Sequence, residues 1–178
     1  LGNESLAGTA LASLWIPESV VTMGERVLRN TARLESVTVD PSNTAFYSLD
    51  GVLLKRNPAR ALHYPARKSG SFTLPDGITV VETGVFTGPQ GLTGIRFPRT
   101  VTQIAAHAFE GCSLVELTLP EGVVSVGARA FADNRQCRWV RLPTSLVTLG
   151  PGTFAGCDVL SHVTLSPRLT VQIGRAHV

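Results

Sequence analysis

The side chains that could carry out chemistry in this chain are few and widely spaced. Its four histidines, His63, His107, His162 and His177, include no pair at a spacing used for metal ligands. The serines and acidic residues do not include a Gly-x-Ser-x-Gly nucleophile elbow, and no Gly-x-x-x-x-Gly-Lys phosphate loop is present. We therefore expect no catalytic residue, metal ligand or cofactor site in this chain, and predict that it is not an enzyme.

Composition indicates a folded chain with a modest excess of positive charge. Of the 178 residues, 43% are hydrophobic and 16% are charged, which allows a substantial core and argues against a disordered tail. The net charge of +3 is too small by itself to predict a nucleic-acid or membrane-surface partner. No apolar run approaches the roughly 20 residues that cross a bilayer, so we expect no membrane insertion.

One short pattern of apolar residues returns about every 23 positions. Pro75, Pro98, Pro120 and Pro143 are 23, 22 and 23 residues apart, and the same step reaches Pro17, Asp40 and Ser166. Before Pro120 stands the ladder Leu114, Leu117 and Leu119, a pattern typical of a strand that faces a shared core. This period lies in the leucine-rich-repeat range of ~20–29 residues.

Several units continue after the proline with a glycine and then an aromatic residue, with Glu82 and Ala105 in the glycine column and Leu28 in the aromatic column as departures. Gly127 and Gly150 occupy the glycine column, where we expect a tight bend. Eleven places after the proline stands phenylalanine in four units: Phe86, Phe109, Phe131 and Phe154. We expect the rings of Phe109, Phe131 and Phe154 to stack in one buried column. The Ala-Phe pairs are predicted to form short helical turns on the convex side of a curved parallel sheet.

The unit Leu-x-x-Leu-x-Leu-Pro-x-x-Val-x-x-Ile-Gly-x-x-Ala-Phe-x-x-Cys resembles the BspA-like leucine-rich repeats. The segment from Leu114 to Asn134 is close to it, with Asn134 where cysteine is usual. The resemblance implies a leucine-rich-repeat solenoid with an extracellular or cell-surface location. It also implies adhesion to a protein or glycan on another cell or host surface.

An insertion and two irregular ends interrupt the repeat. From Asp40 to Pro75 the spacing is 35, about 12 more than one unit, and Asp50-Gly51 between apolar runs predicts an inserted β-hairpin at about 41–70. The first nine residues fit in the middle of a unit, so we expect an array over 1–171 that is truncated at both ends. Residues 172–178 resemble a translated sequencing adapter and are expected to be an artefact.

The three cysteines are predicted to be free thiols. Cys112 and Cys157 share a column two units apart, which places them about 10 Å apart when strands are spaced by ~4.8 Å. This distance exceeds the ~7 Å over which two Cα atoms can be joined by a disulfide. Cys137 stands in a different column, among the core positions of its strand.

The candidate binding residues are the large side chains that should alternate out of the strands on the concave face: Trp15, Arg96, Glu116, Trp139 and Arg141. Tryptophan and arginine are enriched at the energetic centres of protein interfaces. The competing interpretation is an ordinary solvated face on which Trp139 packs against Arg96 or Arg141.

Three functions remain open at this point. The first is a non-catalytic recognition or adhesion module of a larger surface protein. The second is an accessory repeat array of an enzyme whose catalytic domain lies outside this chain. The third is nucleic-acid or polyanion binding through Arg96, Arg138, Arg141 and Trp139, and the small net charge makes it the least favoured.

Overall fold

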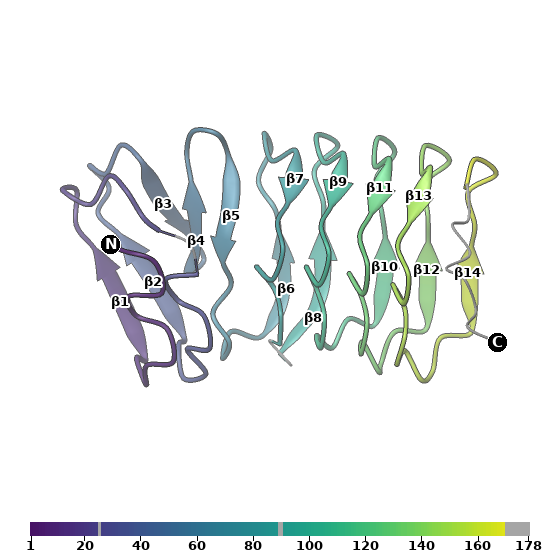
Figure 1. Cartoon of the computed structure of the whole chain (residues 1–178), viewed down its shortest axis with the longest axis horizontal. Coiled ribbons are helices and arrows are strands. Elements are labelled where there is room, and N and C mark those ends of the chain that lie inside the picture. Colours follow the sequence, from purple (N-terminus) through teal and green to yellow (C-terminus); the bar gives the residue numbers. More distant parts are fainter. Residues whose placement is uncertain (25, 89–90, 170–178) are drawn as a thin grey trace.

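The computed structural model describes residues 1–24, 26–88 and 91–169 (Figure 1). Successive units of the chain stack side by side, so that strands one repeat apart become neighbours (Figure 1). The predicted adapter-derived tail, 172–178, lies outside the described residues. None of the described segments forms a helix that could cross a membrane.

The predicted strands before each proline form a row of parallel pairings. β1 (Ser13–Ile16) pairs with β2 (Ser36–Val39), and β6 (Gly70–Thr73) pairs with β8 (Leu92–Arg96). β10 (Glu116–Thr118), β12 (Trp139–Arg141) and β14 (His162–Thr164) form a three-stranded sheet. Leu117 pairs with Val140, and Val140 with Val163, so the register advances by one repeat at each strand. The predicted parallel solenoid is confirmed.

A second row of short parallel strands closes the other side of the core. It comprises β7 (Val80–Val81), β9 (Gln103–Ile104), β11 (Ser125–Val126) and β13 (Thr148–Leu149). Val81, Ile104 and Val126 are buried and belong to the same hydrophobic core as Leu117 and Val140. Each unit therefore contributes apolar residues from two strands and shares its core with the next unit.

The prediction of short helical turns on the convex side is wrong, because the described residues contain no helix. The N–H of Phe109 donates to the carbonyl of Ala130 at 2.8 Å, and that of Phe131 to the carbonyl of Thr153 at 3.0 Å. These bonds join neighbouring units, whereas a helix would use the carbonyl four residues earlier. His107 and Arg129 also adopt left-handed φ angles of 59° and 53°, which a right-handed helix excludes.

The glycine after β11 and after β13 is required for space rather than for a bend. A Cβ atom built on Gly127 would overlap the backbone of Ala105 and Ala106 in the preceding unit. The backbone of Gly127 does not adopt the positive φ that would demand glycine for conformational reasons. The expected tight bend is therefore not the reason for this column, which instead allows two units to approach closely.

The predicted phenylalanine column is confirmed. Ring centroids lie 4.7 Å apart for Phe86 and Phe109, 5.2 Å for Phe109 and Phe131, and 5.9 Å for Phe131 and Phe154. The first three rings are fully buried, and Phe154 is partly exposed. The column therefore links four consecutive units through one continuous aromatic stack.

The insertion is a three-stranded antiparallel sheet, one strand more than the predicted hairpin. β3 (Phe46–Leu49) and β4 (Val52–Lys55) form the predicted hairpin, and β5 (Arg60–His63) adds the third strand. Asp50 and Gly51 form the two-residue turn with φ angles of 50° and 79°, as a type I′ hairpin requires. Figure 1 shows this sheet between β2 and β6.

The inserted sheet separates two hydrophobic cores. Leu53 on β4 packs into a smaller core with Ile16 and Val37, which we call the N-terminal core. Its neighbours Val52 and Leu54 pack into the larger core that holds the phenylalanine column, the C-terminal core. Because successive strand residues point to opposite faces, one strand serves as a wall for both cores.

Candidate functional site

The parallel register of β10, β12 and β14 aligns their outward side chains in two columns. Glu116, Trp139 and His162 form one column, and Thr118, Arg141 and Thr164 form the other. Neighbouring members of a column stand about 4.8 Å apart at the backbone. We call these six side chains the sheet face; they line an open cavity of about 450 Å³.

Trp139 is the largest exposed side chain of the sheet face. It remains 56% exposed, and its ring stacks on His162 with the centroids 4.1 Å apart and the planes 5° from parallel. Trp139 therefore packs on His162, and not on Arg96 or Arg141 as the competing interpretation expected. Sequence reasoning did not select His162, although it stands one repeat after Trp139 in the same outward column.

Arg141 forms no ion pair with any residue that the structure describes. The nearby carboxylate of Glu121 instead accepts hydrogen bonds from the backbone N–H of Thr144, at 3.2 Å, and from its hydroxyl, at 3.0 Å. The Thr144 backbone N–H is the main cause that lowers the pKa of Glu121, and the charge of Arg141 adds a smaller effect. The guanidinium of Arg141 therefore stays available to a partner.

The structure brings together three of the five candidate residues. Glu116, Trp139 and Arg141 line the same cavity. Arg96 lies on β8, which contacts β10, but it does not line the cavity. Trp15 is 60% exposed on β1, which lies beyond the inserted sheet (Figure 1). Trp15 and Trp139 therefore do not form one site.

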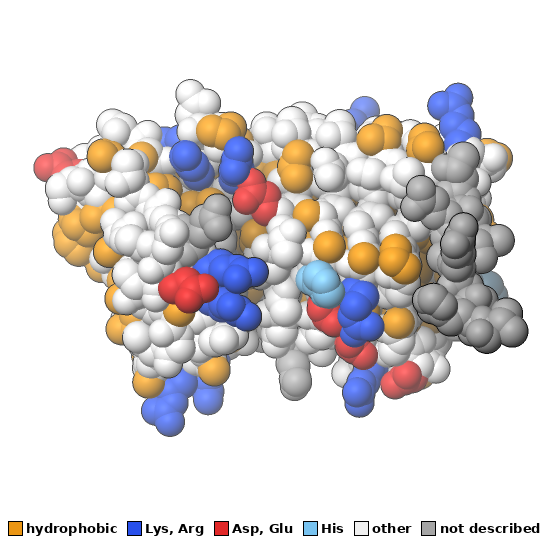
Figure 2. All heavy atoms as spheres, viewed as in Figure 1, with side chains coloured by type: hydrophobic (Ala, Val, Ile, Leu, Met, Phe, Trp, Pro, Cys, Tyr) orange, Lys and Arg blue, Asp and Glu red, His pale blue; other side chains and the backbone are white. Residues whose placement is uncertain are grey.

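Charged side chains on the side of the left-handed turns bind mainly to one another. His107 Nδ1 lies 2.6 Å from Glu110 Oε2, and Arg129 lies 2.7 Å from Glu110 and 2.8 Å from Asp133. Burial raises the pKa of Glu110, but the hydrogen bonds from His107 and Arg129 outweigh it and lower the pKa. Figure 2 shows several charged clusters of mixed sign on this face.

Comparison with known proteins identifies the repeat. Residues 1–49 and 61–176 match six copies of the BspA type leucine rich repeat region. No curated protein matches the sequence.

Solved structures share this fold. A leucine rich cell surface protein of Faecalibacterium prausnitzii is 21% identical with a TM-score of 0.71, covering 97% of this chain and 51% of its own. A leucine-rich repeat protein of Eubacterium ventriosum is 23% identical with a TM-score of 0.74, covering 94% and 58%. The pneumococcal vaccine antigen PcpA is 21% identical with a TM-score of 0.71, covering 96% and 48%. The chain thus spans about half the length of these proteins.

Proposed function

The chain belongs to the BspA-type leucine-rich repeat family, and on this basis we propose that it is a non-catalytic recognition module which binds a protein or glycan at a cell surface. The single observation that carries the proposal is the exposed indole of Trp139, held by His162 in the middle of the sheet face. A cross-strand ring pair adds only about 0.2–1 kcal/mol to the stability of a sheet. Tryptophan and arginine are both residue types enriched at interface centres.

The open form of the sheet face supports a large partner rather than a small molecule. Small-molecule sites usually enclose most of the ligand surface, whereas the sheet face is a broad hollow lined by side chains of three adjacent strands. Glu116 on one side and Arg141 on the other provide charges of both signs, which would orient a partner. The surface location is supported by the name of the Faecalibacterium prausnitzii relative, a cell surface protein.

The proposal is tested with arrays of secreted proteins and of glycans. We expect the chain to bind at least one array member, and the variant Trp139→Ala/Arg141→Ala to bind it with a loss of about 2 kcal/mol or more. Thermal unfolding of both proteins establishes that the fold is retained.

Trp15→Ala is the matched control, because Trp15 is equally exposed on an equivalent strand in the other half of the chain. Array binding that persists in Trp139→Ala/Arg141→Ala with an intact fold would exclude the sheet face as the binding site. Binding that is lost in the Trp15 variant would move the site to β1 and β2.

A further inference from the structure

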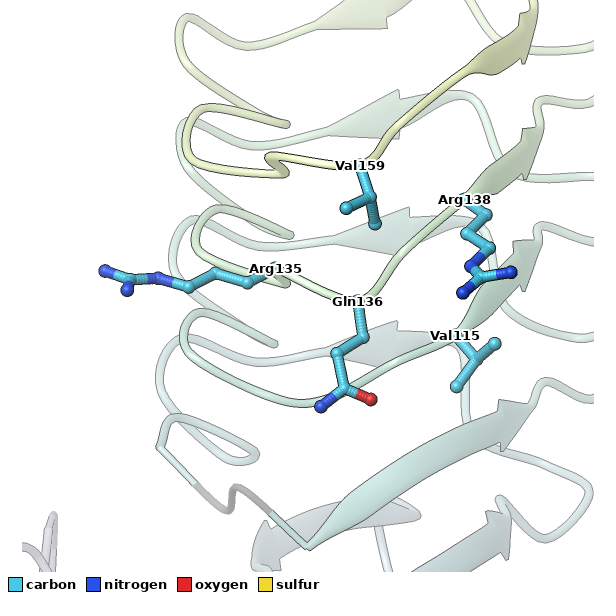
Figure 3. A pocket seen from close by; sticks show the side chains of 5 residues that line it. All are labelled: Val115, Arg135, Gln136, Arg138 and Val159. Atoms are coloured by element: carbon cyan, nitrogen blue, oxygen red, sulfur yellow. The ribbon is translucent and has the colours of Figure 1, made fainter.

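A second hollow lies beside the sheet face, where the chain enters β10, β12 and β14. Figure 3 shows its lining, which we call the rim groove: Val115, Arg135, Gln136, Arg138 and Val159. Its volume is about 340 Å³. Val115 and Val159 are 42% and 48% exposed, although valine is a residue type that folding usually buries. The groove therefore presents two exposed valine side chains to a partner.

The backbone of Val115 and Arg138 in the rim groove is already hydrogen-bonded. The N–H of Val115 donates to the carbonyl of Thr93 at 3.1 Å, and the N–H of Arg138 donates to the carbonyl of Val115 at 2.9 Å. The carbonyl of Arg138 accepts from the N–H of Ser161 at 3.1 Å. At these two positions a partner cannot add itself as a further strand, because that mode of binding needs free backbone groups. Recognition there must act through side chains.

The charge of the rim groove is positive and unpaired. Arg135 and Arg138 are exposed, and within the described part of the chain neither forms an ion pair. Arg129, in the same repeat, is bound by both Glu110 and Asp133. Among the described residues no carboxylate lines the groove. In Figure 3 the Arg138 side chain extends toward Val115, whereas the Arg135 side chain extends away from the other four residues. One free guanidinium group, that of Arg138, thus borders the apolar floor that Val115 and Val159 form.

The rim groove and the sheet face are joined by the backbone. Arg138 precedes Trp139, and its carbonyl also accepts hydrogen bonds from the Ser161 hydroxyl at 3.2 Å and from the His162 N–H at 3.3 Å. The Arg138 backbone is thereby tied to the strand that carries the ring under Trp139. A single partner can therefore contact the rim groove and the sheet face at the same time, because the positions of the two surfaces relative to each other are fixed.

We propose that the rim groove binds an acidic, apolar and extended segment of the partner protein. An aspartate or glutamate carboxylate of that segment meets Arg138, since guanidinium and carboxylate groups pair through two parallel hydrogen bonds. An apolar side chain of the segment lies between Val115 and Val159. This inference rests on the proposed recognition function and specifies the chemistry of its partner.

The apolar floor favours a protein segment over a nucleic acid or a sulfated glycan. Binding of polyanions is driven by many phosphate or sulfate contacts and has no use for exposed valines. The chain's net charge of +3 is also small for a polyanion-binding surface. An acidic protein segment uses both Arg138 and the valines.

The probe is a short fluorescent peptide in which glutamate and leucine alternate, with binding measured by fluorescence anisotropy. Two matched peptides separate the contributions, one with glutamine in place of glutamate and one with serine in place of leucine. We expect the glutamate–leucine peptide to bind, and each matched peptide to bind about tenfold more weakly, as for the loss of a charged hydrogen bond or a buried side chain. A heparin fragment serves as the polyanion.

Arg135→Gln/Arg138→Gln should weaken peptide binding about tenfold or more, and Val115→Ser should weaken it while the charge is unchanged. Arg33→Gln is the matched control, because Arg33 is exposed and precedes β2 at the repeat position of Gln136. Absence of peptide binding, or equal binding by wild type and the double arginine variant, would overturn the inference. Tighter binding of heparin than of the peptide would replace it with polyanion recognition.

The proposed function can fail separately from this inference. If Trp139→Ala/Arg141→Ala no longer binds the array partner while the arginine substitutions leave peptide binding unchanged, only the inference about the rim groove is overturned. If peptide binding depends on Arg138 but Trp139→Ala/Arg141→Ala still binds the array partner, the sheet-face site is overturned and the rim-groove inference is retained.

Discussion

At the scale of single residues, one column shows how different side chains do the same work. The Sγ of Cys112 donates to the carbonyl of Phe86 at 3.0 Å, and the Sγ of Cys157 donates to the carbonyl of Phe131 at 3.4 Å. Between them, Nδ2 of Asn134 donates to the carbonyl of Phe109 at 2.8 Å. Each side chain satisfies the phenylalanine carbonyl of the preceding unit, so asparagine preserves the role of the cysteine that the repeat usually carries.

Asn134 does more than the thiol it replaces, and this predicts a graded loss of stability. Its Oδ1 accepts the N–H of Leu114 at 3.1 Å, so the amide satisfies backbone groups of two segments. Asn134→Ala leaves both groups buried without partners and should lower the free energy of unfolding by about 2–4 kcal/mol. Asn134→Cys keeps the donor and should cost about half as much. Equal losses in urea unfolding of the two variants would contradict this account.

His63 is held neutral by its surroundings and should make the fold sensitive to acid. It lies on β5 with Nε2 3.5 Å from the Thr31 hydroxyl, and burial lowers its pKa to about 4 from 6.5. The unfolded chain therefore binds a proton more tightly than the folded chain between these values, so stability falls as the pH drops from 6.5 to 4.

The loss from His63 should reach about 3 kcal/mol at pH 4, because each unit of pKa corresponds to about 1.4 kcal/mol. It is measured by comparing how the free energy of unfolding changes with pH in wild type and in His63→Gln. Carboxylates titrate in the same range in both proteins, so their contribution cancels. Parallel curves for the two proteins would show that His63 is protonated without cost in the folded state.

At the scale of elements, the inserted sheet has a different role from an appended loop. Strand β4 contributes Leu53 to the N-terminal core and Leu54 to the C-terminal core, and all three residues from Val52 to Leu54 are fully buried. The continuous apolar run at these positions is typical of a strand covered on both faces. The insertion therefore joins two short repeat arrays by providing a wall to each.

Leu53→Ala and Leu54→Ala should destabilise opposite halves of the molecule. Each removes a fully buried side chain, and the expected cost is about 2–5 kcal/mol. Amide hydrogen exchange should show lost protection mainly in β1 and β2 for Leu53→Ala, and mainly in β6 and β8 for Leu54→Ala. The adjacent positions make each variant the control for the other. Matching exchange patterns would mean that β4 belongs to a single core.

The same elements show how far sequence reasoning reaches. The ladder of Leu114, Leu117 and Leu119 repeats in many units, so strand positions, register and the phenylalanine column were predictable. The helical turns were not predicted correctly, because Ala130-Phe131 suits a helix locally while the N–H of Phe131 donates to Thr153 of the next unit. The third inserted strand follows Asn57-Pro58, a turn-forming pair that sequence reasoning left unused.

At the scale of the whole molecule, the insertion also limits the binding site. Alternation along the strands correctly predicted that the five candidate side chains point to solvent, since all five are exposed. Sequence spacing treated the sheet as continuous from Trp15 to Arg141, whereas β1 and β2 form a sheet separate from β10, β12 and β14. The contact between Trp139 and His162 depends on side-chain orientation, which repeat alignment does not specify.

Two cores in one chain predict that unfolding is not a single two-state transition. The N-terminal core is much smaller than the C-terminal core and lacks the stack of phenylalanine rings, so it should melt first. In repeat proteins each unit is stabilised by its neighbours, and a foreign element between units weakens that coupling. Calorimetry should give a total unfolding enthalpy larger than the van't Hoff enthalpy of the main transition. Leu53→Ala should lower the temperature of the first step and leave that of the second almost unchanged. Equal enthalpies in wild type, together with one transition that shifts as a whole in Leu53→Ala, would show that β4 couples the two cores into one cooperative unit.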